Sequence, residues 1–314
     1  MRIVLLLSAL LATTAVAGPV PYQGGMRVVS TPLPPVSAPS QKVRYAGGYT
    51  VAGKGTARLI GLSDLIVTPG KDGVRVDAVS DYGDRVHFTV PAQGGEGPLE
   101  IDALRGQDGQ PFGNKALSDS EDMAIDPQTG TVYVSFEGDA RVMRYGPGMS
   151  GKGQRLPLTR LSALPGNEGL EALTFHRDAA GKASLILGAE VGGFWQCGLD
   201  DYVCRDLIGP TTPGFAYKLV SLAPLDAARP DEMLALYRFY TPWTGARSVL
   251  RVLRLDGRRL VLTDTLLTIA PPLPNDNYEG VSAVKTAEGY RLYLISDPIG
   301  DNDPTRLLMF DWTR

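Results

Sequence analysis

Hydrophobic and polar residues alternate with a period of two along most of this chain, in short runs rich in Val, Ile, Tyr and Thr. Successive side chains of a β-strand point to opposite faces, so this alternation predicts strands that bury one face. About 21 such runs follow one another, separated by turns that contain Gly or Pro. No amphipathic helical pattern longer than about three turns interrupts them. The sequence therefore predicts an all-β fold.

An acidic phrase recurs at the start of several runs, at intervals of about 50 to 60 residues, which is typical of a propeller or another array. Each copy opens an apolar alternation, passes a turn and enters a second apolar stretch that ends in an acid. The opening and closing acids are Glu121 and Glu137, Glu171 and Glu190, and Glu279 and Asp297. A hairpin brings the start of its first strand beside the end of its second. We therefore expect each pair to meet, and the pairs to form a ring of carboxylates at one mouth of a channel.

The number of strands predicts a single closed β-propeller over residues 42–314, of five or six blades. At about four strands per blade, the runs make five blades, with starts near residues 63, 121, 171, 217 and 281. A sixth, degraded blade stays open, because the intervals before residues 121 and 281 are the longest. A strand near 43–51 should close the ring beside a C-terminal strand at 307–312.

The N-terminal residues have the features of an export signal. Arg2 is followed by the apolar run Ile3 to Leu11 and by Ala15-Val16-Ala17, a small-residue cleavage site. We expect residues 1–17 to be removed near Ala17 and the mature protein to be periplasmic or secreted, without a membrane span. Residues 18–41 are rich in Pro and predict an extended leader rather than a strand.

Composition narrows the class of partner. The formal net charge is −3, and the chain has no cluster of Lys and Arg. Nucleic-acid binding requires such clusters, so it is not expected. A small anionic or ester substrate fits better, and we expect a monomer.

Cys197 and Cys204 are the two cysteines of the chain. In an exported protein a local disulfide is the expected pairing, because the alternatives of a redox pair or a metal site lack a Cys-x-x-Cys spacing and a nearby His. His87 and His176, the two histidines, both lie in apolar alternations typical of strands, and nothing supports either as the base of a Ser-His-Asp mechanism.

Oxygen-bearing side chains are the ligands that hard cations such as Ca²⁺ prefer. The acidic phrases supply them at the expected mouth, together with Asp119, Asp122 and an Asn. The candidate ligands are Glu121, Glu137, Glu171, Glu190, Asn277, Glu279 and Asp297. The alternative is that Asp, Asn and Gly are present only because turns favour them. Positive charges that could grip an anion are Arg85, Arg238 and Arg306, unless they form salt bridges with the same acids.

Several segments resemble the phytase-like family of exported bacterial proteins, described as having esterase-like activity of phytase. The similar segments are Asp276 to Val281, Leu292 to Asp297, Thr305 to Leu308, Gly61 to Leu65, Ser80 to Gly83, Gly166 to Leu173, and Arg238 to Tyr240 with Gly245 and Arg247. The resemblance covers about residues 42 to 314. It departs at Tyr237, where the family commonly has Glu, and at Pro298 to Gly300, which interrupts an acidic stretch. The resemblance implies a β-propeller and a phosphoester or ester hydrolase.

The leading functional hypothesis is a metal-dependent ester or phosphoester hydrolase acting at the channel mouth through a cation-bound water, with Glu279 and Asp297 as catalytic acids. Two alternatives remain open. One is a non-catalytic propeller that binds a ligand or partner in the cell envelope. The other is a lactonase-like propeller, whose single divalent site also uses Glu, Asn and Asp.

Overall fold

The structure is a computed structural model that describes residues 26–36, 42–161, 169–190, 192–241, 243–298 and 303–314. The predicted signal peptide at residues 1–17, with its cleavage site near Ala17, lies outside the described residues. So does most of the predicted leader at 18–41.

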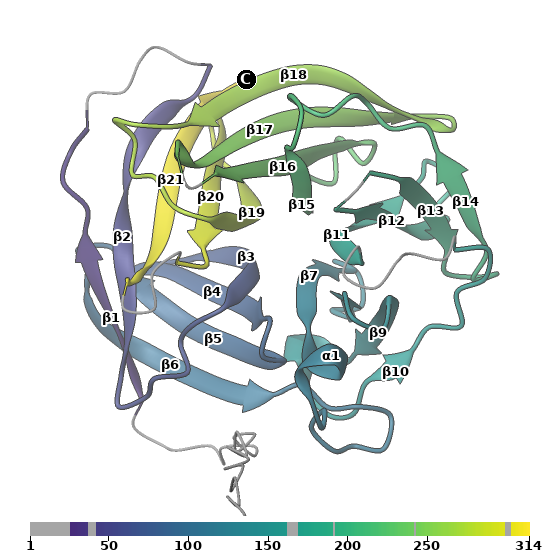
Figure 1. The fold of residues 1–314 in the computed structure, drawn as a ribbon, viewed down its shortest axis with the longest axis horizontal. Helices are drawn as coiled ribbons and strands as arrows, with labels where there is room; N and C mark the ends of the chain where they lie inside the picture. The colour runs from purple at the N-terminus through teal and green to yellow at the C-terminus, as the bar shows by residue number, and fades with distance from the viewer. Residues whose placement is uncertain (1–25, 37–41, 162–168, 191, 242, 299–302) are drawn as a thin grey trace, which may run out of the picture.

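Antiparallel sheets arranged around a common axis make up the structure, which is all-β as predicted (Figure 1). Three of the sheets are separate and four-stranded, and in each of them the strands are paired in chain order. The first contains β7 (Ser120–Ile125), β8 (Val132–Phe136), β9 (Arg141–Tyr145) and β10 (Gln154–Arg155). The second contains β11 (Leu170–Arg177), β12 (Ala183–Ala189), β13 (Phe194–Gly198) and β14 (Cys204–Leu207). The third contains β15 (Lys218–Pro224), β16 (Glu232–Thr241), β17 (Gly245–Asp256) and β18 (Arg259–Ile269).

The remaining strands form a nine-stranded sheet that contains two further four-stranded series joined by β1 (Arg27–Pro32). One series is β3 (Leu62–Gly70), β4 (Gly73–Ser80), β5 (Asp84–Pro91) and β6 (Gly95–Ala103). The other is β19 (Tyr278–Lys285), β20 (Gly289–Ser296), β21 (Thr305–Thr313) and β2 (Arg44–Lys54). The described helices are α1 (Lys115–Ser118) and a 3₁₀ turn, η1 (Pro147–Met149). No described helix has the length and apolar character needed to cross a membrane.

The first strand of each series lies nearest the axis. In sequence order these strands are β3, β7, β11, β15 and β19, and each contacts the next, with β19 returning to β3. They begin close to residues 63, 121, 171, 217 and 281, where the sequence predicts each repeat to start. The periodicity of the sequence therefore locates the innermost strand of every series.

The N-terminal region closes the ring. Strand β2 pairs with β21 from Arg44 opposite Asp311 to Val51 opposite Thr305, as predicted. The expectation that residues 18–41 contain no strand is wrong for Arg27–Pro32, which forms β1 between β2 and β6. Two sheet edges there offer free backbone groups, and Val28 and Ser30 are buried against them. Pro32 lies at the end of β1, where a missing N–H disturbs the ladder least.

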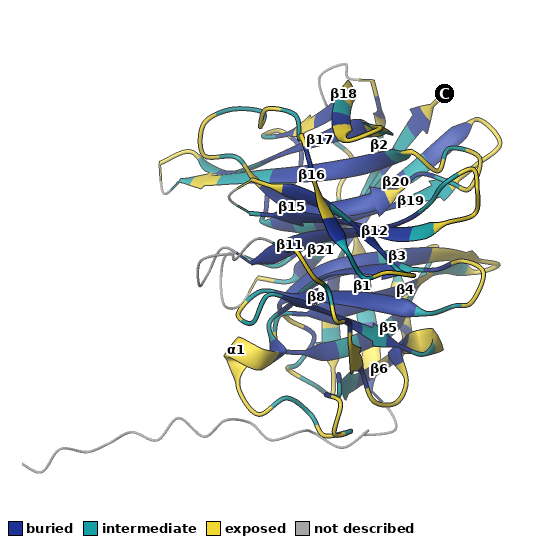
Figure 2. Ribbon diagram, turned by 90° about the vertical axis from the view of Figure 1, so that its right-hand side faces the viewer, coloured by how far each residue is buried: buried dark blue, intermediate teal, exposed yellow. Residues whose placement is uncertain are grey.

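Apolar layers between neighbouring series form the core. Between β15–β18 and the series that contains β19, Leu234 and Leu236 pack with Leu292, Leu294 and Phe310, and all five are buried. Similar layers lie at the other junctions. Figure 2 shows the buried residues concentrated in the strands and the exposed ones in the connecting turns. Burial between faces fixes the angle of each sheet to the axis.

Each innermost strand has a register irregularity near its start, of the kind that a β-bulge produces. The shifts lie between Leu62 and Asp64, Ser120 and Met123, Leu170 and Ala172, Leu219 and Ser221, and Tyr278 and Gly280. A bulge leaves backbone groups without ladder partners. These groups must then find other acceptors near the axis.

Asp64 and Asp122 supply those acceptors. Asp64 Oδ2 accepts a hydrogen bond from the backbone N–H of Met123 at 3.2 Å. Asp122 Oδ2 accepts from the N–H groups of Leu173 at 2.7 Å and Leu222 at 3.0 Å. Two buried side chains therefore connect β3, β7, β11 and β15. We call Asp64 and Asp122 the axial pair.

The axial pair shares a hydrogen bond between its carboxyl groups, and burial raises the pKa of both. The pKa of Asp64 reaches about 7, and that of Asp122 is raised well above its ordinary value, with the charge of Asp64 as a further cause. Two adjacent buried carboxylates cannot both ionise cheaply, so the pair retains a proton at neutral pH. Gly280 occupies the equivalent position of β19. A Cβ there would lie 2.7 Å from the Asp64 Cα.

Removing the Asp122 side chain should destabilise the whole fold. In Asp122→Ala the N–H groups of Leu173 and Leu222 lose their acceptor, so we expect the free energy of unfolding to fall by about 2–5 kcal/mol. Asp122→Asn keeps an acceptor oxygen and can donate to Asp64, so its loss should be less than half as large. Urea unfolding of both variants checks this. A free energy of unfolding of Asp122→Ala equal to that of the wild type would show that these hydrogen bonds contribute little.

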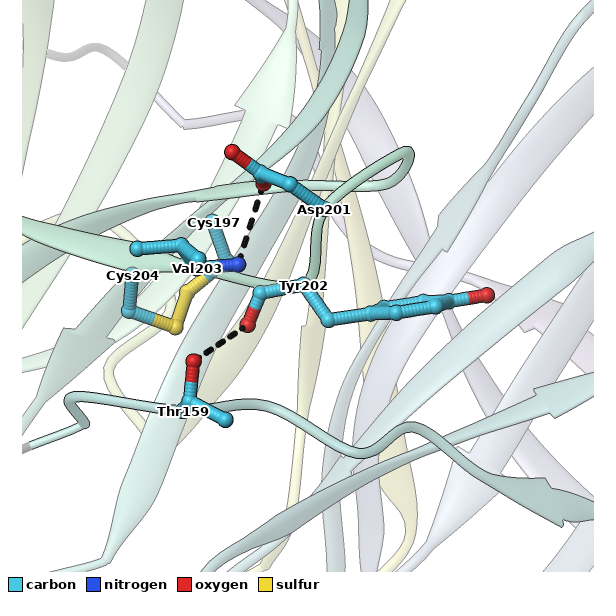
Figure 3. Close-up of a disulfide and its surroundings, with 6 residues drawn as sticks. All are labelled: Thr159, Cys197, Asp201, Tyr202, Val203 and Cys204. Carbon is cyan, nitrogen blue, oxygen red and sulfur yellow. Dashed lines mark hydrogen bonds between the residues drawn. A yellow bond between two sulfur atoms is a disulfide. The ribbon is translucent and has the colours of Figure 1, made fainter.

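A disulfide joins Cys197 and Cys204, as predicted. The two residues face each other across β13 and β14, with their Cα atoms 3.9 Å apart. The turn between them is also held by Asp201 Oδ1, which accepts from the Val203 N–H at 3.0 Å (Figure 3). Thr159 Oγ1 donates to the Tyr202 carbonyl at 3.3 Å, which ties this hairpin to the preceding loop.

Reduction of the disulfide should weaken the fold. Closing a loop of this length constrains the unfolded chain by about 2.5 kcal/mol on the chain-entropy model. We expect dithiothreitol to lower the melting temperature of the wild type and to leave a Cys197→Ser, Cys204→Ser double variant unchanged. Intact-mass measurement should show that the oxidised protein lacks two hydrogens relative to the reduced form. Two free thiols in freshly purified protein would contradict the pairing.

Candidate metal and substrate site

The bulge of each innermost strand contains one residue just before the level of the axial pair. In sequence order these residues are Ser63, Glu121, Glu171, Val220 and Glu279, of which Val220 packs in the apolar core. The opening acids of the repeated phrase thus occupy equivalent places in three series. They lie one residue before the level of the axial pair, because Glu121 directly precedes Asp122.

The second strands contribute a further level of charged residues. Directly after β4, β8, β12 and β20 come Asp81, Glu137, Glu190 and Asp297, and Arg238 stands at the corresponding point of β16. Backbone hydrogen bonds fix these ends to the starts of the first strands. The N–H of Glu137 donates to the Asp119 carbonyl at 3.0 Å, and that of Asp297 to the Asn277 carbonyl at 2.9 Å. The structure thus places each opening acid at the same end of its hairpin as its closing acid.

We call this set of carboxylates the acidic ring: Asp81, Asp119, Glu121, Glu137, Glu171, Glu190, Glu279 and Asp297. Three members lie especially close. Asp119, Glu121 and Glu137 each offer an oxygen atom within 4.8 Å of the other two, and all three are half-buried. Asp119 was expected to supply oxygen at the mouth but was not among the candidate ligands, and Asp81 was missed. Asp81 could have been found, since it lies in the segment Ser80 to Gly83 that resembles the phytase-like family.

Mutual repulsion and burial raise the pKa values of several acids of the ring. Burial raises the pKa of Glu121 well above its ordinary value, and Glu171, Asp119 and Glu279 raise it further. The pKa of Glu171 rises to about 9 through burial and the nearby charges of Glu137 and Glu190. Burial likewise raises the pKa of Glu137. A ring without a cation therefore holds protons at neutral pH.

Glu279 and Asp297 have pKa values closer to neutrality. Burial raises the pKa of Glu279 to about 7, against the opposing charge of Arg238. Burial and the charge of Asp81 raise the pKa of Asp297 to about 6. Groups that titrate in this range can both accept and release a proton near pH 7.

Arg238 is the cation that the structure brings into the ring. Its Nε lies 3.2 Å from Glu279 Oε2, and its Nη2 lies 3.6 Å from Glu190 Oε1. Its Nη1 donates to Asn277 Oδ1 at 3.0 Å, and Asn277 Nδ2 donates to Glu279 Oε1 at 2.6 Å. Asn277 therefore links Arg238 to Glu279 through both ends of its amide.

The other two predicted anion-binding arginines have different partners. Arg306 Nη1 lies 2.5 Å from Oδ2 of buried Asp276, which also accepts from Ser296 Oγ at 2.8 Å. Arg85 donates to Asp102 Oδ2 at 3.1 Å and to the Gly148 carbonyl at 3.0 Å. Neither has a described ion pair with the acidic ring. Lysines reach it instead: Lys218 Nζ lies 2.5 Å from Glu190 Oε2, and Lys115 Nζ lies 2.8 Å from Asp81 Oδ2.

The donor set fits a hard divalent cation. Its ligating atoms are all oxygens, as Ca²⁺ and Mg²⁺ require. Asp81 Oδ1 is buried without a hydrogen-bond partner in the described part of the chain, so the ring has unused acceptor capacity. A cation among Asp119, Glu121 and Glu137 would offset the repulsion that raises their neighbours' pKa values. No thiol or imidazole lies in this group, which argues against zinc.

A family model described as "Phytase-like: Esterase-like activity of phytase" matches residues 57–298. Because the match spans well over half of the chain, the protein belongs to the phytase-like family. The matched region contains the whole acidic ring. No curated protein sequence matches the chain significantly.

One solved structure supports the fold. The catalytic domain of the Coprinopsis cinerea GH62 α-L-arabinofuranosidase superposes with a TM-score of 0.51 at 13% identity, covering 91% of this chain and 98% of that one. The major Malassezia sympodialis allergen Mala s 1 gives a TM-score of 0.44 at 11% identity, covering 86% of this chain and 90% of that one. At these identities the first likeness shows a shared fold and nothing about activity.

Calcium should stabilise the protein more at alkaline than at acidic pH. Glu171, Glu279 and Asp297 have folded-state pKa values raised to about 9, 7 and 6. The stability that such groups contribute is present below their unfolded pKa near 4 and is lost as pH rises through the folded values.

We therefore expect the melting temperature of the demetallated protein to fall between pH 5 and pH 8. A cation binds the ionised ring, so the increase caused by millimolar Ca²⁺ should be larger at pH 8 than at pH 5. Calorimetric scans with and without chelator measure both effects. An increase independent of pH would separate calcium binding from the acidic ring.

Proposed function

We propose that this protein is an exported, five-bladed β-propeller that hydrolyses phosphoesters or carboxylic esters at the acidic ring with a divalent cation, preferably Ca²⁺. Counting each four-stranded series as one blade gives the number five. The observation that carries the proposal is the approach of Asp119, Glu121 and Glu137 within 4.8 Å at the mouth of a phytase-like propeller. Such a group is costly unless a cation or protons neutralise it.

The residues divide into three roles in this proposal. Asp119, Glu121 and Glu137 hold the cation, with Glu171 and Glu190 beside them. When bound, the cation supplies a polarised ester oxygen and a more acidic water. Glu279 and Asp297 accept and return the proton, since their pKa values of about 7 and 6 suit general acid–base work.

Arg238 provides a fixed positive charge for an anionic substrate. Its guanidinium is already oriented by Glu279, Glu190 and Asn277, so little side-chain entropy is lost when it binds an anion. Planar guanidinium groups suit the paired oxygens of phosphate and carboxylate. Arg85 and Arg306 are paired instead with Asp102 and Asp276, which are not members of the ring.

A non-catalytic binding propeller is the competing function, and one observation favours it. Arg238 and Lys115 each bridge two carboxylates of the ring and Lys218 pairs with Glu190, so part of the ring's charge is neutralised without a metal. Export to the periplasm or the medium after cleavage near Ala17, and a monomeric state, belong equally to both functions.

The test is hydrolysis of an aryl phosphate, an aryl ester and a lactone, each with Ca²⁺ and with chelator. We expect calcium-dependent turnover of the phosphate or the ester. Glu121→Gln should weaken calcium binding about tenfold, corresponding to about 1.4 kcal/mol, because one charged ligand is lost. Glu100→Gln, at an exposed position of β6, is the matched control. It should change neither the calcium affinity nor the turnover.

The outcomes separate the functions. An unchanged calcium affinity in Glu121→Gln would show that Glu121 is not a ligand of the metal. Calcium binding without turnover of any substrate would favour the binding propeller. Opening of the lactone alone would favour a lactonase.

A further inference from the structure

Exposed aromatic side chains gather on two neighbouring turns of the β15–β18 sheet. Phe215 is fully exposed, Trp243 is 93% exposed and Tyr240 is half exposed. Single exposed apolar residues are common on protein surfaces, whereas a group of large ones marks a binding surface. We call these three residues the aromatic rim.

Both turns are fixed by local hydrogen bonds. The N–H of Tyr217 donates to the Gly214 carbonyl at 3.2 Å, and Ala216 has a φ of 69°, so Phe215 lies at the tip of a tight turn. Thr241 Oγ1 accepts from the Thr244 N–H at 3.1 Å, which holds the turn that carries Trp243. Local hydrogen bonds therefore restrain the backbone next to Phe215 and Trp243, which lowers the entropy lost on binding.

The rim borders the acidic ring. Lys218 pairs with Arg238 across β15 and β16, and directly beyond them the rings of Tyr217 and Phe239 lie 5.3 Å apart. Tyr240 follows Arg238 by two residues in a regular strand, so both side chains share one face. Figure 2 shows the exposed tip between β16 and β17 on the side of the molecule that carries α1, which directly precedes β7.

Arg238 is the cation on the same face as Tyr240. Arg247 stands opposite Phe239 in the β16–β17 ladder, so its side chain lies on the other face of the sheet. The positive charge next to Tyr240 is therefore that of Arg238, whose guanidinium can receive an anion.

We propose that the aromatic rim binds the flat ring of an aromatic phosphoester while its phosphate is directed toward the acidic ring. The proposal rests on the proposed function of that ring. Three observations select this substrate class: planar apolar side chains suited to stacking, the positive charge of Arg238 for the phosphate, and the ion pairs that connect Arg238 to Glu279 and Glu190. An alkyl phosphoester would satisfy the charges and leave the rim exposed to water.

Binding can be measured without turnover by using phosphonates, in which a P–C bond replaces the ester. Trp195 and Trp312 are 4% and 5% exposed, so fluorescence quenched by added iodide reports Trp243. In the presence of Ca²⁺, we expect phenylphosphonate to protect this tryptophan and methylphosphonate to leave it accessible.

Affinities come from calorimetry on variants of the full chain. Phe215→Ala combined with Tyr240→Ala should weaken phenylphosphonate binding about tenfold, the usual effect of losing an aromatic stacking partner. Methylphosphonate binding should be unchanged. Leu262→Ala removes an exposed apolar side chain from β18 of the same sheet and should alter neither affinity.

Equal affinity for the two phosphonates, or a double variant with wild-type affinity for both, would overturn the aromatic rim. Hydrolysis distinguishes this failure from failure of the acidic ring. If phenyl phosphate is not hydrolysed and phenylphosphonate still binds through Phe215 and Tyr240, the binding role of the aromatic rim is supported and the hydrolase activity is refuted. If the wild type and the Phe215→Ala, Tyr240→Ala variant hydrolyse phenyl phosphate and glycerol phosphate equally well, the hydrolase activity is supported and the binding role of the aromatic rim is refuted.

Discussion

Two buried carboxyl groups at the axis hold together the strands on which the rest of the structure depends. Asp64 and Asp122 bind backbone N–H groups of three other strand starts, which the bulges have released from the sheets. Because the bulges are stabilised in this way, each innermost strand turns its opening residue toward the mouth. The positions of Glu121, Glu171 and Glu279 therefore follow from hydrogen bonds made one level deeper along the axis.

Repulsion between carboxylates is reduced in different ways in the axial pair and in the acidic ring. At the axis, water is excluded and a retained proton joins the carboxyl groups. At the mouth, cationic side chains of neighbouring elements reach the acids, as Arg238 does for Glu279 and Glu190. Repulsion that remains at Glu121 and Glu171 favours a cation. One architecture thus contains a level suited to structure and a level suited to chemistry.

Much of this arrangement could be predicted from the sequence, because it depends on spacing. Alternation of period two identifies the strands, and the recurring acids locate the start of each innermost strand. The pairing of β2 with β21 and the disulfide of Cys197 and Cys204 also follow from local pattern and chain order. The strand β1 was missed, since its pairing depends on two edges that exist only once distant segments have folded.

The sequence by itself determined the strands, the repeat and the acids that open and close each hairpin, because these are properties of neighbouring residues. Only the tertiary structure decided what each acid contacts. Asp122 and Glu121 are adjacent, yet opposite side-chain directions at a bulge send one to the axis and the other to the mouth. Arg238 reaches Glu279 and Glu190 of the two neighbouring series, whereas Arg85 and Arg306 bind acids of their own series. Charge interactions depend on distance in space, which the order of residues does not specify.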